Sequence, residues 1–200
     1  MEALQALLNN WAISFDLPIL EWIQANLQSG FLDTVMPIIT AFGNGGIFWI
    51  ACAVLLMFLP KTRRIGFGMA FALTMGLVVC NIILKPGVAR IRPYDLQAEL
   101  GVTIRLLCEA QHDFSFPSGH TIASFEAAVV MLKNSKKLGI PAMILAILIS
   151  FSRLYLYVHY PTDVLASVIL GTLFALIGDA IAAKVAPKLH FGKKGKFEAA

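Results

Sequence analysis

Long apolar runs separated by short polar turns dominate this chain. Five runs carry at most one charged side chain each and predict membrane-spanning helices. Several lie near the lower end of the roughly 17–25 residues that a span needs, but five of them in one small chain favour spans over buried core helices. The runs are Gly46–Leu59, which could extend upstream, Ile65–Leu84, Ser118–Leu132, Leu138–Ser152, continuing to about residue 158, and Val164–Ala183.

Residues 1–30 are apolar but repeatedly interrupted. Trp11, Phe15, Ile19 and Trp22 recur at helical spacing, with polar side chains between them. This pattern favours an amphipathic helix at the membrane interface, with a sixth span as the alternative. We therefore expect an N-terminal membrane-associated segment at residues 1–30, a membrane-embedded domain at 31–185 and a basic cytoplasmic tail at 186–200.

Composition agrees with a membrane protein. The hydrophobic fraction is 58% and the charged fraction 14%, whereas soluble proteins carry about 25% charged residues. We expect an all-α, polytopic helical bundle of one domain. The three cysteines show no spacing typical of a metal site, and Cys52 and Cys80 fall inside predicted spans.

Basic residues predict the orientation of the bundle. Counting spans places three basic clusters on the same side, which the positive-inside rule identifies as cytoplasmic. The opposite side has fewer basic residues that are not part of a motif, and it would face outward. The clusters are Lys61, Arg63 and Arg64; Lys133, Lys136 and Lys137; and the tail lysines Lys184, Lys188, Lys193, Lys194 and Lys196.

Three polar motifs fall at the outer ends of the predicted spans. Residues 85–93 read K-P-G-V-A-R-I-R-P, residues 117–120 read P-S-G-H, and residues 152–163 read S-R-L-Y-L-Y-V-H-Y-P-T-D. Charged groups near a membrane are costly unless they are paired or functional. Their clustering at one level of the bundle therefore argues for a functional site.

The residue types suit phosphate chemistry. His159 and Asp163 are four residues apart, so a helix would let the carboxylate accept the Nδ1 proton and leave the Nε2 lone pair free. His120 follows Ser118 and Gly119 at a predicted helix start, where free N–H groups favour an anion. The simpler alternatives are a structural histidine at the end of a span and an ordinary helix cap.

Lys85, Arg92 and Arg153 would supply positive charge for a phosphate, and the planar guanidinium suits bidentate binding. Taken alone, these residues could equally be headgroup anchors. Arg90 and Arg105 have no assigned role by this pattern.

The motifs match K-x6-R-P, P-S-G-H and S-R-x5-H-x3-D at all eleven defining positions. In this respect the chain resembles the type 2 phosphatidic acid phosphatase superfamily, which includes the vanadium haloperoxidases, over about residues 60–185. The resemblance implies that His159 attacks phosphorus and forms a phosphohistidine, that Asp163 orients it, and that His120 protonates the leaving oxygen and then activates water. The implied phosphate-binding residues are Lys85, Arg92, Ser118, Gly119 and Arg153.

The resemblance implies an integral membrane enzyme that hydrolyses a lipid phosphomonoester or diphosphate at the extracytoplasmic face of the cell membrane. Small bacterial-looking members suggest undecaprenyl diphosphate as substrate. Phosphatidic acid, phosphatidylglycerophosphate, other prenyl diphosphates, and a phosphotransferase reaction stay open, as does a lipid-phosphate transporter. We expect membrane lipids as partners and no nucleic acid. We expect no cofactor and no metal, because the sequence lacks a suitable carboxylate cluster.

Two features stay open at this point. Residues 94–116 are long for a connecting loop and could cap the site or be solvated surface. Glu126 lies inside a predicted span, where a functional acid and a buried structural hydrogen bond are equally plausible.

Overall fold

The computed structural model describes residues 2–186, and within them every regular element is helical. The α-helices are α1 (Glu2–Trp11), α2 (Leu17–Leu27), α3 (Gly30–Ala41), α4 (Ile47–Phe58), α5 (Arg63–Gly76), α6 (Lys85–Val88), α7 (Pro93–Glu99), α8 (Gly119–Asn134), α9 (Lys136–Tyr155) and α10 (Pro161–Val185). Two π-helices, η1 (Ala12–Asp16) and η3 (Leu77–Leu84), and one 3₁₀ turn, η2 (Asn44–Gly46), join some of them.

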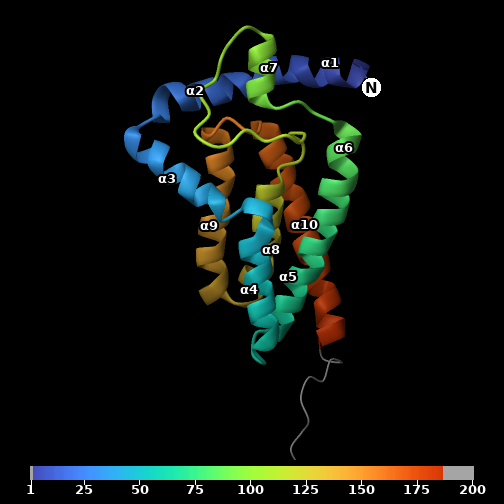
Figure 1. The fold of residues 1–200 in the computed structure, drawn as a ribbon. Coiled ribbons are helices and arrows are strands. Elements are labelled where there is room, and N and C mark those ends of the chain that lie inside the picture. The colour runs from blue at the N-terminus through green and yellow to red at the C-terminus, as the bar shows by residue number, and fades with distance from the viewer. Residues whose placement is uncertain (1, 187–200) are drawn as a thin grey trace, which may run out of the picture.

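Helices α4, α5, α8, α9 and α10 lie alongside one another and form the bundle (Figure 1). Helix α8 packs against α5, α9 and α10. Small residues allow the close approach of α5 and α10: a Cβ atom at Gly178 would lie 2.6 Å from the carbonyl oxygen of Gly68. The core beside this contact contains Trp49, Met69 and Ile149, all nearly inaccessible to solvent.

The expected all-helical class is correct, whereas the count of five spans is not confirmed. Four helical stretches within residues 2–186 are long and apolar enough to cross a membrane. The predicted third span corresponds to α8, whose 16 residues are surrounded by other helices. Such a helix is held by packing and does not need the length of a lipid-facing span. The four stretches are Gly30–Phe58, Arg63–Glu99, Lys136–Tyr155 and Pro161–Val185.

The N-terminal helices α1 and α2 run across one end of the bundle (Figure 1). None of the four candidate spans includes residues 2–27. Leu17 and Leu20 are buried against the bundle, whereas Trp11 and Trp22 are more than half exposed. The division of the chain at residues 30 and 185 and the interfacial role of the first segment stay predictions.

The basic clusters lie at the opposite end of the bundle from α1 and α2. Figure 1 shows the turns α4–α5 and α8–α9 and the end of α10 together at that end. There Asp179 accepts ion pairs from Arg64 at 3.2 Å and Lys133 at 3.0 Å. The tail lysines from Lys188 onward lie outside the described residues.

Candidate active site

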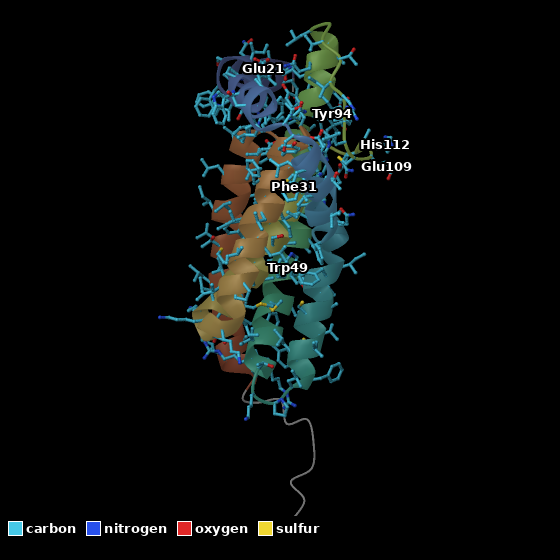
Figure 2. The ribbon with its side chains drawn as sticks, turned by 90° about the vertical axis from the view of Figure 1, so that its left-hand side faces the viewer. Glu21, Phe31, Trp49, Tyr94, Glu109 and His112 are labelled. Atoms are coloured by element: carbon cyan, nitrogen blue, oxygen red, sulfur yellow. The ribbon has the colours of Figure 1, made fainter. Side chains whose placement is uncertain are left out.

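Six of the eight predicted site residues line one pocket of about 750 Å³. The loop 100–118 lies at the same end of the bundle as α1 and α2 (Figure 1), and Figure 2 shows Glu109 and His112 of that loop pointing away from the bundle. Ser118 and Asp163 lie outside the pocket lining, and both are fully buried. The six are Lys85, Arg92, Gly119, His120, Arg153 and His159.

Local structure places His159 directly before α10. Pro161 is the first residue of that helix, where its fixed φ and missing N–H suit the first turn. The Tyr160 backbone N–H donates to Asp163 Oδ2 at 3.1 Å and closes the first turn. His159 and Asp163 are thus held on adjacent turns, 2% and 0% exposed.

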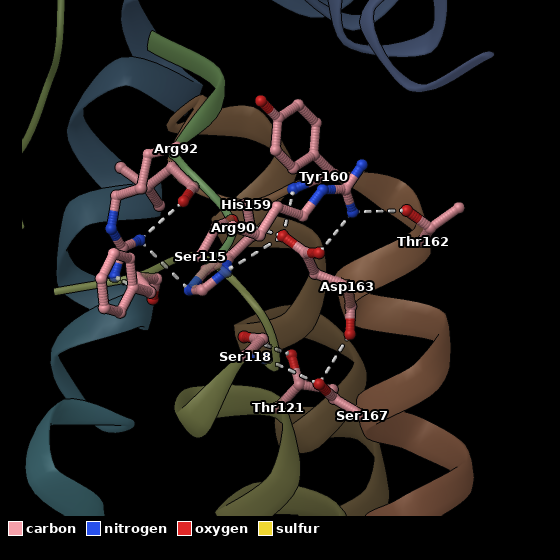
Figure 3. A network of polar contacts seen from close by, with 12 residues as sticks. Arg90, Arg92, Ser115, Ser118, Thr121, His159, Tyr160, Thr162, Asp163 and Ser167 are labelled. Carbon is pink, nitrogen blue, oxygen red and sulfur yellow. Dashed lines mark hydrogen bonds and ion pairs between the residues drawn. The ribbon is translucent and has the colours of Figure 1, made fainter. Parts of the chain in front are cut away.

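The two ring nitrogens of His159 have different neighbours (Figure 3). Nε2 faces Arg92 Nη1 at 3.4 Å, and arginine can only donate, so Nε2 is the unprotonated nitrogen. Nδ1 faces Asp163 Oδ2 at 3.7 Å. That distance is longer than a hydrogen bond, so the expected Nδ1 hydrogen bond to Asp163 is not formed here, although the two side chains face each other.

Burial lowers the pKa of His159 well below its usual value, and the positive charges of Arg92, Arg153 and Lys85 lower it further. The imidazole is therefore neutral at pH 7. A neutral imidazole with an accessible lone pair on Nε2 is able to act as a nucleophile.

His120 stands in the first turn of α8, with Nε2 2.9 Å from Asn44 Oδ1. An amide oxygen only accepts, so Nε2 of His120 carries a proton that it could give to a leaving group. Ser118 makes two contacts within the fold, and its role in phosphate binding stays a prediction. Its backbone N–H donates to Ser167 Oγ at 2.8 Å, and its hydroxyl oxygen accepts from Thr121. It is therefore engaged within the fold, because its side chain and amide turn away from the pocket toward α8 and α10.

Three cations converge on the pocket. Lys85 Nζ and Arg92 Nη2 each lie 2.5 Å from an oxygen of Asp113. Arg153 Nη1 donates to Thr40 Oγ1 at 2.6 Å, while its Nε and Nη2 atoms have no hydrogen-bond partner among residues 2–186. Free guanidinium donors beside two further cations make a site for an anion with several oxygens.

Sequence reasoning missed Asp113, Arg90 and Asp16. Asp113 belongs to the loop 100–118, so part of that loop reaches the site. Partial burial acts to raise the pKa of Asp113, but hydrogen bonds and charge from Lys85 and Arg92 outweigh it and lower that pKa to about 2. Arg90 is buried between Asp16 and Asp163. Its spacing of two from Arg92 gave no signal of this, since its partners are far away in sequence.

The pocket continues from the cations into an apolar section between α4, α5 and η3. Ile50 and Val54 line it from α4, and Leu73 and Leu77 line it from the facing helices. Ile50, Val54 and Leu77 are 44–54% exposed, so this section borders the lipid-facing surface. Glu126 of α8 also lines the pocket, and its Oε1 has no hydrogen-bond partner among the described residues.

Residues 65–185 match the model of the PAP2 superfamily. The chain belongs to this family. It is 30% identical over 167 residues to the undecaprenyl-diphosphatase of Sulfolobus acidocaldarius, covering 82% of this chain and 77% of that protein. It is also 30% identical to undecaprenyl-diphosphatase BcrC of Bacillus subtilis, covering 77% and 79%. The structure of Aquifex aeolicus LpxE is similar, with a TM-score of 0.70, 25% identity, and coverage of 82% and 93%. The protein is therefore a membrane PAP2 lipid phosphatase.

Proposed function

We propose that this PAP2 protein hydrolyses a long-chain prenyl diphosphate, of the undecaprenyl type, to the monophosphate. The observation that carries the proposal is one continuous pocket that joins Lys85, Arg92 and Arg153 to an apolar section at the lipid-facing surface. A phosphate-binding end and a hydrocarbon-binding section in one pocket suit a lipid phosphate. The relatives named undecaprenyl-diphosphatase support the prenyl choice.

In the proposed reaction, the terminal phosphoryl group lies among the three cations. His159 Nε2 forms a bond to phosphorus as the bond from phosphorus to the bridging oxygen breaks. His120, protonated on both ring nitrogens while the anionic substrate is bound, gives its Nε2 proton to that oxygen, and the lipid monophosphate leaves. Water then attacks the phosphohistidine, His120 takes a proton from it, and inorganic phosphate and free His159 are released. Positioning and charge stabilisation supply most of the catalysis in such transfers.

In this reaction Lys85, Arg92 and Arg153 bind only the terminal phosphoryl group, so these residues do not determine which lipid is the preferred substrate. When the substrate is a diphosphate, the leaving group is a phosphate ester, which leaves more readily than the alkoxide of a phosphomonoester. The exposed apolar section would take the prenyl chain. Phosphatidic acid and phosphatidylglycerophosphate have poorer leaving groups at the same site.

We further propose that the reaction needs no metal and occurs at the extracytoplasmic face of the cytoplasmic membrane. The support for metal independence is that Lys85, Arg92 and Arg153 already place positive charge around the pocket. The support for the side is that the basic clusters lie at one end of the bundle, whereas Lys85, Arg92 and His159 lie at the end of the helices that carries α1 and α2. Full activity in excess EDTA is the expected result, and restoration of a lost activity by Mg²⁺ would refute it.

The test is a panel of lipid phosphates assayed side by side with purified protein. Undecaprenyl diphosphate, phosphatidic acid and phosphatidylglycerophosphate are presented in the same detergent micelles at matched surface concentration. We expect kcat/KM to be highest for the prenyl diphosphate. Equal rates or a preference for phosphatidic acid would leave a general lipid phosphatase, and binding without phosphate release would favour a transporter.

A further inference from the structure

A buried ion triad joins the N-terminal segment to the carboxylate beside His159. Arg90 Nη2 lies 2.7 Å from Asp16 Oδ2, and Arg90 Nη1 lies 2.6 Å from Asp163 Oδ1. The three side chains are at most 3% exposed. The Arg90 guanidinium also stacks over the Tyr160 ring, 3.9 Å from its centroid. Two carboxylates thus share one guanidinium in an interior that excludes water.

Asp16 also holds the first turn of α10 directly. The Thr162 backbone N–H donates to Asp16 Oδ1 at 2.9 Å, and the Thr162 hydroxyl donates to Oδ2 at 2.8 Å. Asp16 ends the π-helix η1, a rare element that occurs frequently at functional sites. Within residues 2–186 the Asp16 side chain thus contacts Arg90 and Thr162. Figure 3 shows the same two residues beside Asp163, with Arg90 donating to both Thr162 and Asp163.

Stability alone does not account for this triad. Buried ion pairs are weak contributors to stability because the cost of removing charges from water offsets their attraction. A second buried carboxylate on the same guanidinium adds to that cost. The second carboxylate, Asp16, also affects Asp163. Because Arg90 pairs with both carboxylates, its single positive charge does not neutralise them, and the triad keeps a net negative charge beside the His159 ring.

We propose that Asp16, acting through Arg90, is a positioning residue for the phosphoryl transfer, because it fixes the Asp163 carboxylate and preserves its negative charge toward His159 Nδ1. This proposal rests on the function proposed above. When Nε2 bonds to phosphorus, the imidazole ring gains positive charge. Asp163 stabilises that charge, so any loss of its negative charge slows the transfer while leaving phosphate binding by the cations intact.

The test compares Asp16→Asn with Glu21→Gln in purified protein. Asn keeps the shape of Asp16 and removes its charge. Glu21 belongs to the same N-terminal region and accepts a hydrogen bond from Gln97, away from the triad. We expect Asp16→Asn to lower kcat about 10- to 100-fold, as substitutions behind a functional group commonly do. KM should stay unchanged, and Glu21→Gln should match the parent in both.

A pH profile separates positioning from a purely structural role. Removing the negative charge of Asp16 should shift the acidic limb of kcat/KM, which reports protonation of His159, to lower pH. The direction follows from the negative charge that is removed, because all other charges near His159 are the same in the two proteins. The charged or titratable groups that face His159 are Asp163 from α10, Arg92 before α7, Arg153 from α9, Lys85 from α6, His120 from α8 and Asp113 from the loop, with Cys108 and Tyr94 near Arg153.

The outcomes are distinct. A lower melting temperature with unchanged kcat and pH profile would show that Asp16 only docks the N-terminal helices, and would overturn the proposal. If Asp16→Asn does not yield monodisperse protein, Thr162→Val is the second variant. It removes the hydroxyl that donates to Asp16 and accepts from Arg90, without changing charge, and a smaller fall in kcat is expected. An unchanged kcat there also overturns the proposal. Failure of the parent protein to hydrolyse any lipid phosphate would instead refute the proposed function.

Discussion

Arg92 Nη2 lies 2.5 Å from Asp113 Oδ1, so a carboxylate of the loop 100–118 occupies part of the pocket beside the cations. Lys85 contacts the other oxygen of the same carboxylate. A carboxylate between two cations stands where oxygens of a phosphoryl group would bind. A substrate must therefore displace Asp113 or share the cations with it.

We predict that Asp113→Asn strengthens inhibition by vanadate or inorganic phosphate by about 3- to 10-fold, since each tenfold corresponds to about 1.4 kcal/mol of relieved competition. The matched control is Glu109→Gln on the same loop, because Glu109 is exposed and the ion pairs of Lys85 and Arg92 in the described residues are with Asp113. Inhibition constants for both variants decide the question. Weaker inhibition in Asp113→Asn would mean that Asp113 orients Lys85 and Arg92 and does not compete with the phosphoryl group.

The pH profile of the parent protein follows from the lowered pKa of His159. Burial and three neighbouring cations disfavour the imidazolium, so the neutral nucleophile persists below the ordinary histidine pKa of about 6.5. We expect the acidic limb of kcat/KM to lie below pH 6.5. The ionisation of the substrate, measured by ³¹P NMR in the same micelles, is subtracted first. A limb at or above pH 6.5 after this correction would contradict the burial argument.

His159→Ala should abolish turnover, because no other described side chain in the pocket has the same unprotonated nitrogen facing the cations. Asp163→Asn should lower kcat strongly, by about 10²- to 10⁴-fold, through loss of the charge that orients and stabilises the ring. Phosphate that is bound to the protein after an alkaline rapid quench and is released by acid reports the phosphohistidine. Near-parent turnover in His159→Ala would remove the assignment of the nucleophile.

The helical class, the bundle and the gathering of six site residues could be predicted from sequence, because apolar runs and three short motifs are local signals. The span count could not, since α8 is short and is held by α5, α9 and α10, which no local pattern reveals. The sequence left phosphate binding and headgroup anchoring as alternative roles for Lys85, Arg92 and Arg153. Their position around one pocket favours phosphate binding. Their roles stay proposals until the assays above are made.

The contacts of Asp16, Arg90 and Asp113 could not be predicted for a different reason. Asp16 and Thr162 are 146 residues apart, and Lys85 and Asp113 are 28 apart. Each pairing depends on how the segment η1–α2 and the loop 100–118 fold back over the end of the bundle. The contact between the Ser118 N–H and Ser167 was equally invisible in the sequence, because the two residues are 49 positions apart, and the phosphate-binding role of Ser118 stays a prediction.

The orientation of the site can be tested by cysteine labelling in intact cells. A cysteine at Glu109, exposed on the outer loop, should react with an impermeant thiol reagent, whereas one at Lys61, exposed in the α4–α5 turn, should not. The half-buried native Cys108 is first replaced by serine, since it lies in the same loop. The reverse labelling pattern would invert the topology and place the site at the cytoplasmic face.

The apolar section of the pocket gives a final prediction about the lipid chain. Val54 lines this section and is 44% exposed, whereas Leu55, its neighbour on α4, is 62% exposed and outside the lining. Val54→Trp should fill the section and raise KM for a long-chain prenyl diphosphate by about tenfold, because a lost apolar contact area of about 50 Å² corresponds to about 1.3 kcal/mol. KM for a short, water-soluble prenyl diphosphate should stay unchanged, as should both values in Leu55→Trp. Equal effects of Val54→Trp on both substrates would show that the tail lies elsewhere on the bundle, and equal effects of the two substitutions would indicate a general disturbance of α4.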